Sequence, residues 1–179
     1  MDKVALFVDL GYLNKITAKF GNLKVDFSKF PEMFLDQTLE SHYRTYVYHC
    51  PPYQSNPPTD EEKLRKSKHD KFIHNVKSKS RIELRNGRLV KHSESLFSQK
   101  RVDTYFAIDL VKLSIQKNIN KAILIAGDSD FVPAIIEAKE QGVVIKVYYF
   151  KGTAHDELLQ CCDDKEEITP DLLQKIKYG

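Results

Sequence analysis

The stretch KAILIAGDSDF, Lys121–Phe131, indicates both a fold and a site. After the first lysine, five consecutive residues are apolar and rich in β-branched side chains. A short apolar run that ends in glycine is typical of a strand buried on both faces, as in a parallel sheet. Asp128 and Asp130 follow Gly127, where such a strand reaches its carboxyl end. Open α/β sheets bind ligands at this edge, so the stretch predicts a site as well as a strand.

A helix is predicted to follow this strand, from Phe131 to about Gln141. Asp130 is placed to cap the helix, Pro133 is tolerated in its first turn and Gly142 suits its end. The acidic pair therefore has a purely structural explanation, in which Asp130 caps the helix and the carboxylate before it makes the turn. The alternative explanation is that both side chains serve a ligand.

The same order of elements occurs near the start of the chain. Val4–Val8 is a second continuous apolar run, and Asp9 and Gly11 follow it before a predicted helix over residues 12–20. If the two strands are neighbours in one parallel sheet, Asp9 lies beside the later acidic pair. The repetition makes a functional explanation of these carboxylates stronger than either motif does alone.

A third acidic position precedes the helical pattern of residues 104–117. Asp103 stands at the N-terminal end of this pattern, where backbone dipoles favour a carboxylate, so capping is its structural explanation. Asp109 comes six residues later, about 240° around an ideal helix. The two aspartates therefore share a face only if Asp103 precedes the first regular turn.

The composition is that of a soluble globular protein. Of 179 residues, 41% are hydrophobic and 30% are charged. No run approaches the ~18 apolar residues of a membrane span, and the apolar start is too short for a signal peptide. Cys50, Cys161 and Cys162 lack zinc-ligand spacing, and vicinal cysteines rarely bridge each other. We therefore expect a cytoplasmic protein that does not enter a membrane.

Charge is unevenly distributed along the chain. Residues 61–101 hold 13 Lys or Arg against 5 Asp or Glu, whereas the rest of the chain has a net charge of −5. Such a stretch is either a solvated basic face or a contact surface for an anionic partner such as nucleic acid. The capping-box pattern Thr59-x-x-Glu62 predicts a mostly basic helix here. We expect one domain, 1–179, with a basic helical and loop insert at about 51–100.

The alternation of strands and helices predicts a three-layer α/β/α domain with a mostly parallel central sheet. Five motifs occur in order over nearly the whole chain: FVDLGYLN, ELRNGRLV, KRVDTYFAIDLVKL, ILIAGDSDFVPAI and QGVVIKVYYF. Together they resemble the NYN domain of the LabA-like branch of the PIN-like nuclease superfamily. The resemblance implies a PIN-like (Rossmannoid) fold and a metal-dependent ribonuclease site at the carboxyl ends of the strands.

The resemblance also implies a set of catalytic, metal-binding aspartates. These are Asp9, Asp103, Asp128 and Asp130, with Asp109 as an optional fifth metal ligand. Converging carboxylates repel one another unless they are protonated or neutralised by a cation, and oxygen ligands favour Mg²⁺ or Mn²⁺ over zinc. We expect Asp9 and Asp128 to ligate directly. Asp103 and Asp130 ligate directly, act through water or orient the nucleophile.

Contacts to RNA, single-stranded or structured, are expected from five further residues: Tyr12, Asn14, Lys100, Arg101 and Ser129. Ser129 and nearby helix amides suit a phosphate, and Lys100 and Arg101 suit the RNA backbone. Tyr12 either stacks on a base or packs in the protein. Many relatives have asparagine where this chain has Tyr12, and Asn14 is close but shifted.

Two other functions are compatible with parts of this pattern. The first is an NYN-fold module that binds RNA or a regulatory protein with little or no turnover, and a homo-oligomer is a further expectation. The second is a phosphatase of the haloacid-dehalogenase type, because GDSDF resembles its late acidic motif. That chemistry needs a second aspartate two residues after the first, but Asp9 is followed by Leu10-Gly11. The sequence contains no dinucleotide-binding, P-loop or nucleophile-elbow motif.

Overall fold

The central sheet is parallel throughout. The computed structural model describes residues 1–93 and 97–179, with side chains for these except at 97–100. Within these ranges the sheet has six strands in the order β3-β2-β1-β6-β7-β8, and each neighbouring pair is parallel. The strands are β1 (Asp2–Asp9), β2 (Glu40–His49), β3 (Ile82–Asn86), β6 (Lys121–Ile125), β7 (Val144–Tyr149) and β8 (Asp164–Glu167).

The direction of strand addition reverses between β1 and β6. The chain first adds β2 and β3 on one side of β1, and then returns to add β6, β7 and β8 on the other side. In doubly wound sheets, the crevice at such a switch point is where ligands bind. Asp9 ends β1 and Asp128 closely follows β6, so the two predicted acidic turns flank the switch point.

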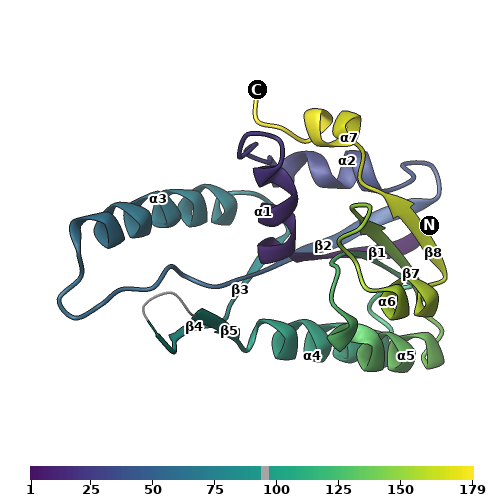
Figure 1. The fold of residues 1–179 in the computed structure, drawn as a ribbon. Helices are drawn as coiled ribbons and strands as arrows, with labels where there is room; N and C mark the ends of the chain where they lie inside the picture. Colours follow the sequence, from purple (N-terminus) through teal and green to yellow (C-terminus); the bar gives the residue numbers. More distant parts are fainter. Residues whose placement is uncertain (94–96) are drawn as a thin grey trace.

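Helices cover both faces of the sheet (Figure 1). One core packs beneath α1 (Leu10–Ala18), α2 (Phe30–Phe34) and α7 (Pro170–Lys175), and the other beneath α4 (Val102–Ile115), α5 (Val132–Glu140) and α6 (Asp156–Cys161). Side chains alternate along β1, so Leu6 belongs to the first core and Phe7 to the second. The predicted three-layer architecture with a mostly parallel sheet is confirmed. No helix in the described parts of the chain is long and apolar enough to cross a membrane.

Parts of the segment 51–100 extend past the carboxyl edge of the sheet (Figure 1). α3 (Asp60–Lys77) projects from the body, and β4 (Arg88–Lys91) pairs antiparallel with β5 (Phe97–Lys100) as a separate ribbon. α3 starts with the predicted capping box, in which the side chain of Thr59 accepts from the backbone of Glu62 and the reciprocal bond is also present. β3 lies within this segment and is part of the central sheet, so the segment is joined to the sheet along a full strand.

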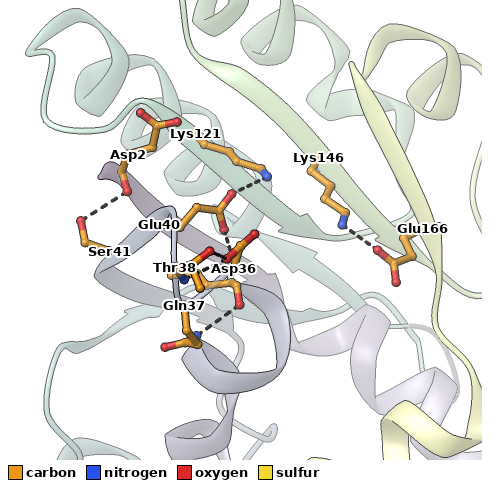
Figure 2. A network of polar contacts seen from close by, with 10 residues as sticks. Asp2, Asp36, Gln37, Thr38, Glu40, Ser41, Lys121, Lys146 and Glu166 are labelled. Carbon is orange, nitrogen blue, oxygen red and sulfur yellow. Dashed lines mark hydrogen bonds and ion pairs between the residues drawn. The ribbon is translucent and has the colours of Figure 1, made fainter.

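Two of the ion pairs that link strands of the sheet are shown in Figure 2, and the first lies at the opposite, amino edge. Lys121 Nζ on β6 lies 2.6 Å from Glu40 Oε1 on β2, across the start of β1. Lys146 Nζ on β7 lies 2.6 Å from Glu166 Oε2 on β8. The Glu40 carboxylate also accepts a hydrogen bond of 2.9 Å from the backbone N–H of Asp36. Glu40 and Glu166 are thus both paired with a lysine.

Candidate active site

An open cavity of about 540 Å³ lies over the switch point, and we call it the acidic cavity. Its walls come from the turns after β1 and β6, the start of α4, the loop after β7 and the ribbon strand β4. It is lined by Asp9, Gly11, Tyr12, Lys15, Leu89, Asp103, Gly127, Asp128, Thr153 and His155. The structure therefore brings three of the predicted acidic residues to one cavity.

Asp9 ends β1 and caps α1. Its Oδ1 accepts a hydrogen bond of 3.1 Å from the backbone N–H of Tyr12, which orients the carboxylate from within the protein. Burial raises the pKa of Asp9, and the charge of Asp103 raises it further, against the lowering effect of the Tyr12 N–H. The site therefore holds this carboxylate where ionisation is disfavoured.

Asp128 has the same role in the second turn. It caps the 3₁₀ turn η2 (Ser129–Phe131), and its Oδ1 accepts a hydrogen bond of 3.0 Å from the backbone N–H of Asp130. The prediction that Asp130 caps the following helix is wrong, because α5 has no side-chain cap. The reason is the 3₁₀ turn, which precedes the α-helix and moves the capping position two residues upstream.

Asp103 reaches the cavity from the first turn of α4. The N-cap of this helix is Arg101, which has a φ of 75° and no capping bond from its side chain, so Asp103 is not the cap. Burial raises the pKa of Asp103, as do the charges of Asp128 and Asp130. Asp130 is exposed and does not line the cavity, but its charge belongs to the same group.

None of these four aspartates forms an ion pair with a described side chain. The cation that most clearly faces them is Lys15, whose charge lowers the pKa of Asp9. Grouped carboxylates of this kind are stabilised by a cation, and their oxygen donors suit Mg²⁺ or Mn²⁺. The donor chemistry therefore fits such an ion, although no three potential metal ligands among the described residues already form a closed site.

Asp109 lies outside the acidic cavity. Its Oδ2 accepts hydrogen bonds from Arg85 Nε at 2.8 Å and from the hydroxyl of Tyr48 at 3.0 Å. α4 turns this side chain toward β2 and β3, where it neutralises Arg85. The structure therefore does not bring Asp109 together with the other aspartates.

Tyr12 joins two walls of the cavity. Its hydroxyl forms a hydrogen bond of 2.8 Å with Thr153 Oγ1 and accepts one of 3.0 Å from the backbone N–H of Phe150. The residue is only 8% exposed, and its ring lies against Gly127. Of the two roles considered for Tyr12, the structure favours packing over stacking on a base.

The other predicted RNA contacts lie in different places. Ser129 Oγ is 3.2 Å from Nδ1 of His155 at the mouth of the cavity, and Arg101 is exposed at the start of α4. Asn14 is exposed on α1 and lines a neighbouring cavity. The side chain of Lys100 lies outside the described residues.

Sequence reasoning missed Lys15 and His155, which line the acidic cavity. Lys15 comes four residues after Gly11, and this helical spacing could have placed it on the face that Gly11 presents to the site. His155 follows β7, whose carboxyl end meets the same sheet edge. No local pattern distinguishes it from the other five histidines of the chain.

A doubly wound parallel sheet with grouped aspartates at its carboxyl edge is the architecture of PIN-like α/β proteins. The chain belongs to the NYN domain family, whose model matches residues 3–169. It is also similar to the crystal structure of a protein of unknown function from Vibrio parahaemolyticus RIMD 2210633. The TM-score is 0.69 at 15% sequence identity, over 95% of this chain and 94% of that chain, a likeness that concerns the fold alone. No curated protein matches the chain.

Proposed function

We propose that this protein is a metal-dependent endoribonuclease of the LabA-like branch of the NYN family, which hydrolyses RNA phosphodiester bonds. One observation carries the proposal: Asp9, Asp103 and Asp128 line one open cavity and form no ion pair with a described side chain. A phosphate approaches such a group only when a cation neutralises it. The PIN-like fold, which is common among nucleases, supports the same function.

In this proposal Asp9, Asp103 and Asp128 would hold Mg²⁺ or Mn²⁺, with Asp130 at the rim acting directly or through water. When bound, the ion supplies charge neutralisation and Lewis-acid activation of water at the phosphodiester. The caps made by Asp9 and Asp128 hold their carboxylates in place before any ligand arrives, so less reorganisation is needed. Lys15 would bind a phosphate oxygen of the same strand.

The whole chain acts as one unit in this proposal, and the segment 51–100 holds the RNA. Lys63, Lys66 and Lys71 line a shallow hollow on α3, and Arg101 is exposed at the start of α4. Lys63 and Lys66 form surface ion pairs with Asp60 and Asp70, which a phosphate would have to displace. Cations arranged in this way bind phosphates with little sequence preference, and the binding weakens as salt is raised. Single-stranded or structured RNA is therefore the expected partner. The three free thiols of the chain support a reducing location such as the cytoplasm.

We infer that a second copy of the chain covers an apolar groove between α4 and α5. The groove has a volume of about 620 Å³, and Ile108 and Ile115 beside it are 53% and 58% exposed. It also holds one lysine, Lys112, and one glutamate, Glu137, neither paired with a described side chain. A two-fold related copy would offer each of these charges its opposite and cover the apolar surface.

The nuclease proposal is tested by incubating end-labelled single-stranded RNA with Mn²⁺, Mg²⁺ or EDTA. Wild type is compared with Asp128→Asn, because asparagine also caps helices and so preserves the turn. Asp171→Asn, which alters an exposed carboxylate outside the cavity, is the matched control. We expect metal-dependent cleavage by wild type and the control, and no cleavage above the EDTA background by Asp128→Asn.

Cleavage retained by a folded Asp128→Asn protein would overturn the proposed site. If neither protein cleaves but both bind the RNA, the alternative function is supported: an NYN-fold module that binds RNA or a regulatory protein with little or no turnover.

A further inference from the structure

A second cavity adjoins the acidic cavity, and we call it the histidine cavity. It has a volume of about 310 Å³ and lies between the first turn of α1, the end of β2 and the inner face of α3. Gly11 lines both cavities, so the two cavities adjoin at this residue. A polymer that places one unit in the acidic cavity can therefore place its neighbour in the histidine cavity.

Two imidazoles form the buried wall of this cavity. His49, at the end of β2, is 3% exposed, and its Nδ1 lies 3.2 Å from Nε2 of His69 on α3. The remaining ring nitrogens, His49 Nε2 and His69 Nδ1, are buried and have no partner within hydrogen-bonding distance among the described residues, although the Asn86 side chain lies close enough to His49 to act on its pKa. The nearest carboxylate oxygen to His69, on Asp70, is 3.6 Å away, beyond hydrogen-bonding distance.

Buried polar atoms almost always have a hydrogen-bond partner, so two unpaired nitrogens beside one cavity require a partner that the described residues do not supply. Burial lowers the pKa of His49 to about 4, helped by the charge of His69 and opposed by the nearby Asn86 amide. Burial likewise lowers the pKa of His69, against the effect of Asp70. Both rings are therefore neutral at pH 7, and because one donates to the other, their two remaining nitrogens together offer one donor and one acceptor.

The rest of the lining fits a flat heterocycle attached to a phosphate. The ring of Phe72 is partly buried on the inner face of α3 and supplies an aromatic surface. Asn14 supplies an exposed amide with both donors and an acceptor, and Lys68 supplies an exposed cation. The volume lies at the lower end of the range for small-molecule sites. This combination of neutral edge donors, aromatic face and single cation suits a nucleotide better than a bare phosphate.

We propose that the histidine cavity binds the unpaired base of the nucleotide next to the scissile phosphate, and so gives the protein a base preference at that position. The proposal rests on the proposed function only in taking the nucleotide to be part of an RNA strand. A base held in this cavity cannot remain in a duplex, so the strand is single-stranded or flipped out at this point.

The test follows the ring proton resonances of His49 and His69 by NMR while AMP, GMP, CMP or UMP is added in EDTA. Ribose 5-phosphate, which lacks a base, is the ligand control. We expect at least one of the four nucleotides to shift both histidines and ribose 5-phosphate to leave them unchanged. If no nucleotide shifts them, or if ribose 5-phosphate shifts them equally, the base site does not exist.

Two substitutions in the cavity test the proposal with variants that are expected to fold. Asn14→Ala alters an exposed side chain, and Phe72→Leu keeps an apolar residue, so both should fold. We expect Phe72→Leu to weaken the Kd of the favoured nucleotide about 5- to 150-fold through lost stacking, and Asn14→Ala to weaken it about tenfold. His74→Ala, on the same helix but outside the cavity, should leave Kd unchanged. Unchanged affinity in both cavity variants would overturn the proposal.

A last comparison separates RNA from free nucleotides as the ligand. With Mg²⁺ in place of EDTA, a trinucleotide whose linkages resist hydrolysis can occupy both cavities, so it should bind at least tenfold more tightly than the mononucleotide while shifting the same histidines. Equal affinity would identify a free-nucleotide site and overturn the RNA assignment. Because no cleavage is measured, a negative nuclease assay leaves these outcomes intact, and a negative titration leaves the nuclease proposal intact.

Discussion

Tyr12 lies so close to Gly127 that a Cβ atom on the glycine would fall 2.4 Å from Cε2 of the tyrosine ring. The two residues belong to the two turns that flank the switch point, one after β1 and one after β6. Each aspartate is within three residues of this contact, so the contact holds together the two turns that carry Asp9 and Asp128. The close approach explains why residue 127 is glycine.

Gly127→Ala should therefore destabilise the protein. The added methyl group would meet the Tyr12 ring and, at 2.9 Å, the backbone oxygen of Thr153. Overpacking of this kind costs about 1–3 kcal/mol, which lowers Tm by about 2–4 °C per kcal/mol in a chain of this size. Thermal and urea unfolding measure the change. In the double variant that carries both Gly127→Ala and Tyr12→Ala, the loss of stability should be smaller than the sum of the two single losses, because the ring that clashes is gone. A loss equal to that sum would argue against the contact.

Asp103→Asn should stabilise the metal-free protein while abolishing cleavage. The pKa of Asp103 is raised in the folded state, so above the ordinary value of 3.8 the folded protein holds more protons than the unfolded chain. The wild type therefore loses stability as pH rises from 3.8 through the raised pKa. Asparagine does not ionise, so the Asp103→Asn variant does not lose this stability. Its Tm should therefore exceed that of wild type by a small amount at pH 3.8 and by more at pH 7.

Asp163→Asn provides a control of opposite sign. Although burial raises its pKa, hydrogen bonds from Lys139 and from the backbone of Ile145 hold the pKa of Asp163 below its ordinary value. Its ionised form stabilises the fold at neutral pH, and this contribution is lost as pH falls. Asp163→Asn should lower Tm at pH 7. If Asp103→Asn and Asp163→Asn lowered Tm equally, the ionised form of Asp103 would not be destabilised in the folded protein.

Mn²⁺ or Mg²⁺ should raise the Tm of wild type. An ion that binds only the folded state adds about 2.7 kcal/mol of stability at a concentration 100 times its Kd. Differential scanning calorimetry with increasing Mn²⁺ measures the effect. The shift should disappear in Asp9→Asn and remain in Asp109→Asn, because Asp109 pairs with Arg85 outside the cavity. A Tm that rises equally in both variants would place the ion elsewhere.

Charge reversal in the groove between α4 and α5 should control self-association. Lys112→Glu and Glu137→Lys each place like charges opposite one another across a two-fold interface, so each should weaken the dimer. The double variant restores opposite charges and should recover it. Sedimentation velocity measures the dissociation constant. Leu64→Glu, at a 56% exposed leucine on α3, should leave it unchanged; a monomeric wild type at all concentrations would contradict the inference.

Much of the fold can be read from the sequence because the decisive signals are local. The apolar runs after Lys3 and Lys121 are fully buried strands, and each ends in a turn that opens a helix. Parallel strands bring their carboxyl ends to one edge, so the closeness of Asp9 and Asp128 follows from two local patterns and a pairing rule. The position of Asp103 was reached through the resemblance to the NYN family, because its own surroundings suggested only a helix start.

The rest depends on contacts that no local pattern contains. The side chain of Asp109 pairs with Arg85, 24 residues earlier on β3, and therefore does not lie with the other aspartates. The relevant partner of His69 is His49, 20 residues earlier on a strand. Such pairs are set by how helices pack over the sheet, which composition and periodicity do not specify.

The helix caps made by Asp9 and Asp128 also affect how this family can diverge. Each carboxylate holds a turn of the fold through one oxygen and contributes charge to the cavity, so selection on activity and selection on folding act on the same side chain. A lineage that abandons the chemistry but keeps the protein is expected to replace these aspartates by asparagine, serine or threonine, which also cap helices, and seldom by alanine. Inactive descendants should be recognisable in genomes by that restricted pattern of replacement.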